Sequence, residues 1–290
     1  MRISGKTKVC GIIGEPIEHT LSPTMHNAAF EKLNLDFVYV PFKVKMGMLR
    51  EAIRGVRSLG IIGLNVTMPY KSAVMRHLDE VDLVARRVGA VNTILNDEGS
   101  LIGYNTDGVG ALNALKENGV TLNGKNLLLL GAGGAGKAIA FHTAQEVEKF
   151  IILNRTPQKA KKLAEALRRE FGKKKIIGNI LSIKNMKEEL KDADILINAT
   201  SIGMHPNINQ SLVPPNLIKP DLCVMDIVYN PPETKLLKDA KAAGAKTVSG
   251  IEMLIHQGTA SFEVWTKHPA PVEVMRQAAF GKLSEFGVKH

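Results

Sequence analysis

The sequence predicts an α/β protein of two domains, and three observations carry that prediction. The chain has 290 residues, which exceeds the usual size of a single domain. Segments with strand-like and helix-like patterns alternate along most of its length, as they do in sheets covered by helices. In its middle, the apolar run Leu127–Leu130 leads directly into a glycine-rich turn and then a helix-forming segment, as in doubly wound parallel sheets.

The first third of the chain predicts a smaller α/β unit. Its elements are listed by residue range: strands at 8–14, 37–44 and 61–67, helices at 22–33 and 48–59, and helical sequence continuing through Arg87. Ser22 followed by Pro23 is typical of an N-cap and a first helical residue. Two further runs, 90–95 and 101–105, predict a hairpin around Asp97-Glu98-Gly99.

The remainder predicts the doubly wound sheet. A helix from about 109 to 118 leads into strands near Leu127, Ile151, Ile195 and Val224, which alternate with helices. Residues 175–180 and 246–249 can add two more strands. Two helices, at 251–266 and 272–286, then follow, separated by the turn Pro269-Ala-Pro271.

The glycine turn predicts a dinucleotide site. Gly131, Gly133 and Gly136 match the spacing G-x-G-x-x-G after a strand buried on both faces. The first glycine allows the tight turn, the second lets the backbone approach a pyrophosphate, and the third lets the helix pack closely. The pyrophosphate then lies at the N-terminus of the helix, where backbone N–H groups are free.

The next strand indicates which dinucleotide binds. An NAD site usually has Asp or Glu about 20 residues on, bonding the ribose 2′-hydroxyl. Here the strand ends at Asn154, which can bond a ribose or phosphate oxygen, and is followed by Arg155, Thr156 and Lys159. A guanidinium fork and a nearby ammonium suit a phosphate, which favours NADP. The alternative is that Arg155 and Lys159 are solvated charges at the start of a helix.

Composition excludes several classes of protein. The net charge is +10, but the lysines are scattered along helices and aromatic residues are 5% of the chain, which argues against nucleic acid. No apolar run reaches the ~20 residues of a membrane span. Cys10 and Cys223 lie in apolar strands and indicate reduced core thiols, hence a cytoplasmic protein. No cluster of histidine, cysteine and carboxylate has metal-ligand spacing, so we expect no metal.

Four polar clusters lie at the ends of predicted elements in the first third, where α/β sheets bind ligands. They are residues 15–27, 65–71, 89–93 and 105–108. Lys71 and Asp107 are the pair among them suited to proton transfer, since hydride addition to a ketone needs a donor at the developing alkoxide. The alternative is that Lys71 is solvent-exposed and Asp107 caps a helix. His19 and His26 flank the first cluster, and we expect them to orient or pack.

Taken together, these motifs resemble the NADP-dependent shikimate dehydrogenase family, in order and over nearly the whole chain. The resemblance rests on nine segments: His19–Pro23, Asn65–Lys71, Gly89–Thr93, Asn105–Gly108, Gly131–Gly136, Asn154–Thr156, Asn198–Met204, Asp226–Tyr229 and Gly250–Gly258. It implies reversible reduction of 3-dehydroshikimate to shikimate by hydride transfer from NADPH, in the biosynthesis of chorismate and the aromatic amino acids. It also implies an N-terminal α/β substrate domain and a Rossmann NADP domain.

The resemblance also implies roles for individual residues. Lys71 and Asp107 would be the catalytic pair. Substrate binding would involve Thr20, Ser22, Asn65, Thr67, Lys71, Asn92, Asp107, Tyr229 and Gln257. NADP binding would involve Gly131, Ala132, Gly133, Gly134, Ala135, Asn154, Arg155, Thr156, Lys159, Thr200, Ile227, Gly250 and Met253. Thr20 replaces the commoner serine, and Lys159 stands where arginine is common.

The expected substrate domain comprises residues 1–107 and 250–290, because Gln257 belongs with the substrate motifs, and the NADP domain comprises 108–249. Three alternatives stay open. One is a quinate/shikimate dehydrogenase that uses NAD or both cofactors, and another is a catalytically silent nucleotide-binding regulator on the same fold. A basic nucleic-acid-binding module is the most distant. The expected partner is a small-molecule substrate, and a monomer and a homodimer are both open.

Overall fold

The computed structural model describes residues 3–172 and 175–287 and divides the chain into two compact units. The first unit comprises Met1–Asp107 and Ile255–His290, and the second comprises Gly108–Leu254. One boundary lies where the sequence placed it, after Asp107. The other lies between 254 and 255, inside helix α9 (Gly250–Thr266), whereas the sequence placed it at 249/250.

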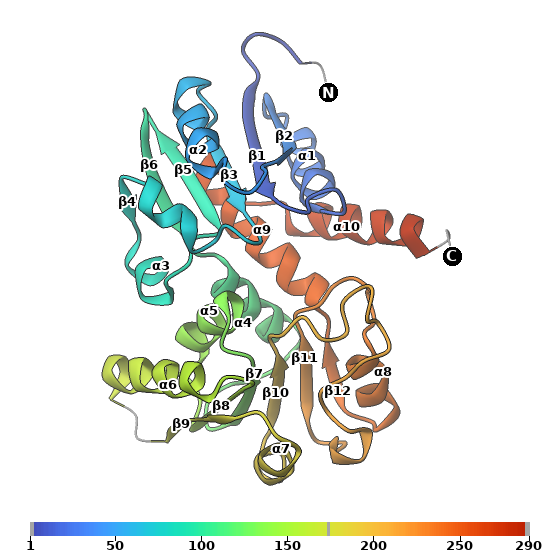
Figure 1. Ribbon diagram of the computed structural model, residues 1–290. Coiled ribbons are helices and arrows are strands. Elements are labelled where there is room, and N and C mark those ends of the chain that lie inside the picture. Colours follow the sequence, from blue (N-terminus) through green and yellow to red (C-terminus); the bar gives the residue numbers. More distant parts are fainter. Residues whose placement is uncertain (1–2, 173–174, 288–290) are drawn as a thin grey trace. The chain divides into compact units, whose positions relative to one another are not determined.

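The first unit is built on a mixed six-stranded sheet in the order β2-β1-β3-β5-β6-β4 (Figure 1). Its strands are β1 (Lys8–Gly14), β2 (Phe37–Lys43), β3 (Gly63–Val66), β4 (Glu80–Val81), β5 (Thr93–Asp97) and β6 (Ser100–Tyr104). Its helices are α1 (Ser22–Lys32), α2 (Leu49–Ser58), η1 (Ala73–His77), α3 (Leu83–Val88) and α10 (Val272–Gly287), together with α9 from Ile255 onward. β1 pairs in parallel with β2 and β3, whereas β5 is antiparallel to β3 and β6.

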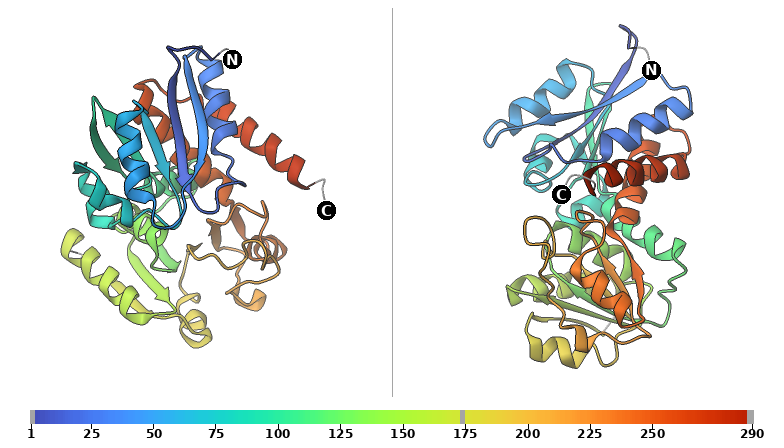
Figure 2. Two further views of the ribbon diagram at one scale, coloured as in Figure 1. Left: turned by 45° about the horizontal axis from the view of Figure 1, so that its top comes forward. Right: turned by 90° about the vertical axis from the view of Figure 1, so that its right-hand side faces the viewer.

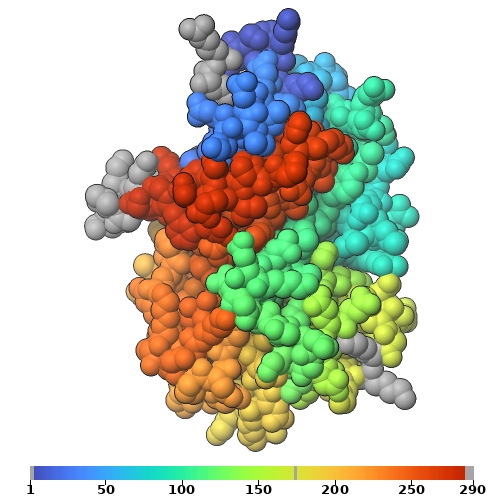
Figure 3. Space-filling model, turned by 180° about the vertical axis from the view of Figure 1, so that it is seen from behind, coloured from blue at the N-terminus to red at the C-terminus, as the bar shows by residue number. Residues whose placement is uncertain are grey.

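Helices cover both faces of this sheet (Figure 2). On one face, Ile53 and Val56 of α2 pack against Ile13 and Leu64 in an aliphatic core. On the other face an aromatic cluster joins α1, β2 and α9, with Phe30, Tyr39, Phe262 and Trp265 as its members. α10 lies alongside α1 on that side (Figure 3). The sheet is therefore packed between a layer of helices on each face.

Two local predictions in the first unit are wrong. Ser22 is the first residue of α1 rather than its N-cap, and the N-cap, Leu21, makes no side-chain capping bond. The sequence through Arg87 is not continuously helical, because the short strand β4 separates η1 from α3. The predicted hairpin is confirmed: Glu98 and Gly99 both have positive φ, 49° and 95°, as its tight turn requires.

The second unit is a six-stranded, wholly parallel sheet in the order β12-β11-β10-β7-β8-β9. Its strands are β7 (Asn126–Leu130), β8 (Lys149–Asn154), β9 (Ile176–Ile180), β10 (Ile195–Asn198), β11 (Cys223–Asp226) and β12 (Lys246–Val248). Its helices are α4 (Asp107–Glu117) from Gly108 onward, α5 (Gly134–Thr143), α6 (Pro157–Phe171), α7 (Ile183–Glu189), η2 (Pro215–Leu217) and α8 (Lys235–Ala242). This strand order is that of the doubly wound dinucleotide-binding fold, so the predicted fold class is confirmed.

The burial of the four leucines of β7 explains why the sequence of this strand is continuously apolar. Leu127 and Leu129 face a core shared with α4, α5 and α6, and Leu128 and Leu130 face one shared with α7 and α8. All four are at most 1% exposed. A strand buried on both faces has no polar side to alternate with, as parallel sheets covered by helices require. Among the described residues, no helix combines the length and apolarity needed to cross a bilayer.

Candidate active site

Lys71 and Asp107 form a close ion pair in the first unit. Lys71 Nζ lies 2.6 Å from Asp107 Oδ2, and their side chains are 25% and 6% exposed. Asp107 follows β6 at the start of α4, while Lys71 lies on the loop after β3. Val91 N donates to the Lys71 carbonyl over 2.8 Å, which fixes that loop. Neither alternative from the sequence fits, because the ammonium is mostly buried and the carboxylate binds side chains.

Asn92 holds the other oxygen of that carboxylate. Its Nδ2 donates to Asp107 Oδ1 over 2.9 Å and also lies 2.9 Å from Thr106 Oγ1 and 3.3 Å from Gln257 Oε1. Its Oδ1 accepts from the backbone N–H of Thr106 over 2.8 Å, so the amide orientation is determined. Both oxygens of Asp107 therefore have partners, which leaves the carboxylate little freedom to turn away from Lys71.

A second layer of neutral groups lies around Asn65, which is 4% exposed. Asn65 Nδ2 has three acceptors within reach: the Asn92 carbonyl at 3.1 Å, Thr93 Oγ1 at 3.2 Å and Ser261 Oγ at 3.0 Å. Its Oδ1 accepts from the Tyr39 hydroxyl over 2.7 Å. Protein groups thus engage the whole amide, and a direct bond from Asn65 to a ligand stays a prediction.

The loop before α1 brings two hydroxyls together. Thr20 Oγ1 donates to Ser22 Oγ over 3.3 Å and accepts from the Ser22 backbone N–H over the same distance. A separate run of hydrogen bonds leads from the Tyr39 hydroxyl through Asn65 and Asn92 to the ion pair. Thr67 is half-buried at the end of β3, four residues before Lys71.

Sequence reasoning missed several members of this network. Tyr39 and Ser261 lay outside the site predictions, and Thr93 and Thr106 lay inside quoted motifs without a role. Ser261 carried a signal, since it follows Gln257 by one helical turn and faces the same side. Tyr39 carried none, because an aromatic residue on a strand is ordinarily core.

The two histidines behave differently. His26 is fully buried, stacks on the Tyr39 ring with centroids 4.4 Å apart, and has neither ring nitrogen bonded to a described residue. Burial lowers the pKa of His26 to about 3, so its ring is neutral at physiological pH and packs as an aromatic. The packing role predicted for His26 is confirmed, whereas His19 is exposed.

The glycine loop of the second unit has the geometry that its spacing predicts. Gly131 has φ +104°, a conformation that favours glycine, and a Cβ there would lie 2.9 Å from the Ala199 carbonyl oxygen. A Cβ at Gly136 would lie 2.4 Å from the Gly131 carbonyl oxygen, so helix α5 packs directly on the turn. A Cβ at Gly133 would meet no atom within 4 Å. The protein's own packing therefore does not require glycine at 133, whereas close approach of a ligand would.

Asn154 connects this loop to the next one. Its Oδ1 accepts from the Ala132 backbone N–H over 3.1 Å, and its Nδ2 donates to the Thr156 carbonyl over 2.9 Å. Arg155, Thr156 and Lys159 are exposed around the start of α6, where Thr156 is the N-cap without a side-chain capping bond. The first turn of α6 has no acidic residue. This helix end is therefore electropositive, which suits an anion.

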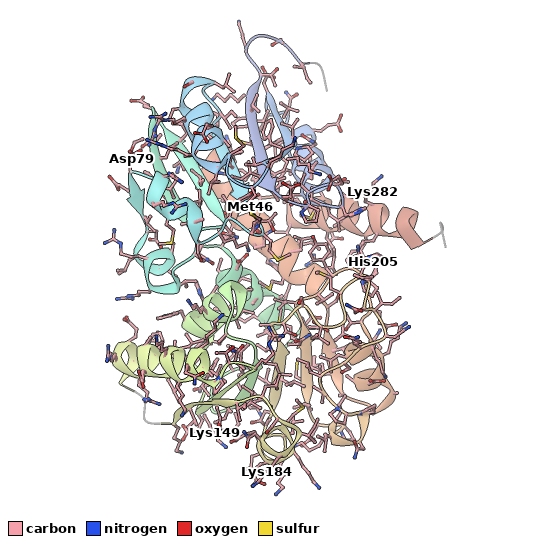
Figure 4. All side chains as sticks on the ribbon, in the orientation of Figure 1. Met46, Asp79, Lys149, Lys184, His205 and Lys282 are labelled. Carbon is pink, nitrogen blue, oxygen red and sulfur yellow. The ribbon has the colours of Figure 1, made fainter. Side chains whose placement is uncertain are left out.

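The remaining predicted cofactor residues lie on the neighbouring turns of the same unit. Thr200 Oγ1 donates to Asn198 Oδ1 over 2.7 Å at the end of β10. Gly250 packs on Ile227, since a Cβ at Gly250 would lie 2.5 Å from the Ile227 carbonyl. Met253 is 6% exposed in the core that also contains Ala132. Tyr229 is half-buried after β11, and burial raises the pKa of its phenol. His205 is exposed on the loop between β10 and β11 (Figure 4).

Comparisons with known proteins agree with this organisation. Residues 12–94 match the model of the shikimate dehydrogenase substrate binding domain, 113–239 that of shikimate / quinate 5-dehydrogenase, and 250–280 that of the shikimate 5'-dehydrogenase C-terminal domain. The shikimate dehydrogenase (NADP(+)) of Methanocaldococcus jannaschii is 46% identical over 284 residues, covering 98% of this chain and 100% of that protein.

Solved structures give the same result. A crystal structure of shikimate dehydrogenase in complex with NADP+ superposes with a TM-score of 0.92 at 45% identity, covering 97% of this chain and 98% of that one. Shikimate 5-dehydrogenase from Listeria monocytogenes, in complex with shikimate and NAD, gives a TM-score of 0.89 at 38% identity, with 96% and 98% covered. With a paired lysine and aspartate in one unit, a dinucleotide-type glycine loop in the other, and near-complete coverage by these relatives, the chain belongs to the shikimate dehydrogenase family.

Proposed function

We propose that this protein is an NADP-dependent shikimate dehydrogenase, which reversibly reduces 3-dehydroshikimate to shikimate in the biosynthesis of chorismate. The observation that carries the proposal is the Lys71–Asp107 pair, with Nζ and Oδ2 2.6 Å apart in a mostly buried setting. A catalytically silent regulator would have no need to hold an ammonium and a carboxylate in this way.

The pair supports a defined proton chemistry. NADP, when bound, supplies the hydride acceptor or donor. The Lys71 ammonium has three N–H groups, and one of them donates to Asp107. A second N–H can then bond the C3 oxygen of the substrate and donate its proton as alkoxide character develops during reduction. Asp107, held by Asn92, orients the ammonium and can accept from a neighbouring substrate hydroxyl.

Recognition of the substrate would use groups on several elements. The adjacent hydroxyls of Thr20 and Ser22 would bind the carboxylate of shikimate as neutral donors, helped by Tyr229. The ring hydroxyls would meet Asn65, Thr67, Asn92 and Gln257. Neutral donors and acceptors suit a polyhydroxylated ring, because each can serve whichever partner the ring presents.

The second unit has residues that fit NADP. Gly133 leaves open space beside the helix α5 N-terminus for a pyrophosphate, with Ala132, Gly134 and Ala135 supplying backbone around it. Arg155, Thr156 and Lys159 would hold the 2′-phosphate, and Asn154 would fix the loop that carries them. The remainder of the cofactor site would be lined by Thr200, Ile227, Gly250 and Met253.

We therefore assign substrate binding to residues 1–107 with the C-terminal helices, and NADP binding to the parallel-sheet unit. We further propose a cytoplasmic enzyme that is a monomer or homodimer. The support for the compartment is that Cys10 and Cys223 are both free and buried, as in proteins of reducing environments.

One assay tests the proposal. NADPH should be oxidised in the presence of 3-dehydroshikimate. NADH at the same concentration should be oxidised more slowly. The reverse reaction should prefer shikimate to quinate. The runner-up is a quinate/shikimate dehydrogenase that uses NAD; it is favoured by the matched family model, which covers both substrates, and by the Listeria relative with NAD. Comparable rates with NADH or with quinate would favour the runner-up, and no turnover with any pair would favour the regulator.

A further inference from the structure

Asp226 is a buried carboxyl that the proposed chemistry does not use. It ends β11 in the second unit and is 0% exposed. Three donors surround it: Thr234 Oγ1 at 2.7 Å from Oδ2, and Asn198 Nδ2 at 3.0 Å and Val228 N at 3.1 Å from Oδ1. Burial raises the pKa of Asp226 to about 6, so its ionised form is costly at neutral pH.

The three donors come from three segments. Asn198 ends β10, Val228 lies on the turn after β11, and Thr234 is the N-cap of α8. The carboxyl therefore joins two strand ends and a helix start at the carboxyl edge of the parallel sheet. Ligands of this fold bind at that edge.

Asp226 helps to determine how Asn198 is turned, together with the Ile202 carbonyl, which accepts from the same Nδ2 over 3.3 Å. An ionised carboxylate can only accept hydrogen bonds, so Asn198 must direct its Nδ2 toward Asp226. Its Oδ1 is then available to Thr200, whose backbone N–H and hydroxyl both donate to it, over 3.1 and 2.7 Å. Thr200 Oγ1 accepts in turn from Ile202 N over 3.2 Å. The Thr200 hydroxyl is thus connected to Asp226 through the side-chain amide of Asn198.

This turn lies against the glycine loop. A Cβ at Gly131 would lie 2.9 Å from the Ala199 carbonyl oxygen and 3.0 Å from Thr200 Cγ2. On the other side, Ile227 N donates to the Asn198 carbonyl over 3.1 Å, and Gly250 packs on Ile227. Asp226 is therefore at the centre of the turns that carry Thr200 and Ile227.

We propose that Asp226 is a positioning residue of the cofactor site, which acts through Asn198 and Val228 to hold Thr200 and Ile227 beside the glycine loop. The inference rests on the proposed binding of NADP to this unit. It adds a residue that touches no reacting group but sets cofactor affinity.

Two substitutions separate hydrogen bonding from charge. Asp226→Asn keeps the shape and can still accept from Asn198 and Val228 through Oδ1 while its Nδ2 faces Thr234. Asp226→Leu leaves those buried donors without an acceptor. Asp194 provides the matched control: its carboxylate accepts from Asn126 N at 2.8 Å and from Lys125 at 2.9 Å, at the opposite, amino end of the same sheet.

The measurements are the Kd for NADP by titration calorimetry, the KM for shikimate, and the thermal unfolding of each variant. We expect Asp226→Leu to raise the Kd for NADP about tenfold, because three buried donors lose this acceptor, with a smaller change in the KM for shikimate. Asp226→Asn should bind NADP within about threefold of the wild type, since one altered bond costs less than a lost one. Asp194→Leu should lower thermal stability without weakening the binding of NADP.

Several outcomes would overturn the inference. One is a folded Asp226→Leu protein that binds NADP as the wild type does, and another is an Asp194→Leu protein with an equal loss of affinity. Should Asp226→Leu not fold, Asn198→Ala breaks the same connection while leaving Thr234 and Val228 on Asp226, and it should show the same loss; unchanged affinity there also refutes the idea. A wild-type protein that does not bind NADP would instead refute the proposed function.

Discussion

The two candidate binding regions of this protein are built in opposite ways. In the first unit, polar side chains hold one another in place: Asn65, Asn92 and Asp107 are each at most 4% exposed as whole residues and are hydrogen-bonded on several sides. In the second unit, the expected cofactor contacts are an open backbone loop and three exposed side chains, Arg155, Thr156 and Lys159. A site that must orient a proton donor needs rigid neighbours, whereas a phosphate can be bound by backbone N–H groups and flexible cations.

The largest effect should come from the rigid side. Lys71→Ala should lower kcat by about 10²–10⁴-fold, the usual contribution of a positioned acid–base group, with a much smaller change in KM. Steady-state kinetics with shikimate and NADP measure both. Lys149→Ala is the control, because Lys149 is similarly buried in a 2.8 Å ion pair with Glu189 but begins β8, at the end opposite Asn154. Near-normal turnover of Lys71→Ala would mean that another group transfers the proton.

Next in size is an effect of pH on stability at Asp226. Burial raises its pKa from an ordinary 3.8 to about 6 in the folded protein. Between those values the folded state binds more protons than the unfolded state, so stability should fall as pH rises through this window. The loss should total about 3 kcal/mol for this group. Denaturant unfolding from pH 4 to 7 should show Asp226→Asn losing that component; an unchanged profile would contradict the assignment.

On the open side, Arg155→Ala should raise the KM for NADP by an order of magnitude or more, because a charge-assisted phosphate bond contributes roughly 1.5–3 kcal/mol. The KM for NAD should be nearly unchanged, since NAD has no 2′-phosphate. Equal losses with both cofactors would show that Arg155 does not distinguish them, and would leave its exposed charge as part of a solvated helix start.

The smallest effects compare two glycines that both have room for a Cβ. Gly55, inside α2, and Gly133 would each place that atom more than 4 Å from any neighbour. Gly55→Ala should stabilise the protein by roughly 0.5–1 kcal/mol through helix propensity. Gly133→Ala should leave stability almost unchanged yet weaken NADP binding, if the space there is for a ligand. Unaltered NADP affinity in Gly133→Ala would remove the pyrophosphate from this position.

Much of this organisation follows from sequence because local patterns determine it. The buried run Leu127–Leu130, the glycine spacing and the Asp97–Gly99 turn each have one conformation that suits them, and each prediction is confirmed. The short strand β4 was not predicted, because two residues, Glu80 and Val81, are too few to show the alternation of apolar and polar residues that is typical of a strand. The boundary near 250 differs because a helix can belong to two units, and a helical pattern carries no mark of where packing changes.

The residues of the candidate site also fall into two groups, those that sequence motifs predict and those that only the tertiary structure identifies. Lys71, Asp107, Asn92 and Gln257 come together in the first unit although they are distant in sequence, and motifs alone suggested them. The hydrogen bond from the Tyr39 hydroxyl to Asn65 could not be predicted from sequence, because it depends on which strands pair. The engagement of Asn154 with Ala132 and Thr156 also follows from tertiary structure, where β7 and β8 lie side by side.

The central claim is that Lys71 and Asp107 act as one catalytic unit, and a double-mutant cycle tests it most directly. Values of kcat for 3-dehydroshikimate reduction would be compared among the wild type, Lys71→Ala, Asp107→Asn and the double variant. Because the two side chains share a hydrogen bond of 2.6 Å, the double variant should lose less than the product of the two single losses. Losses that multiply would mean that the two residues act independently and would contradict the account.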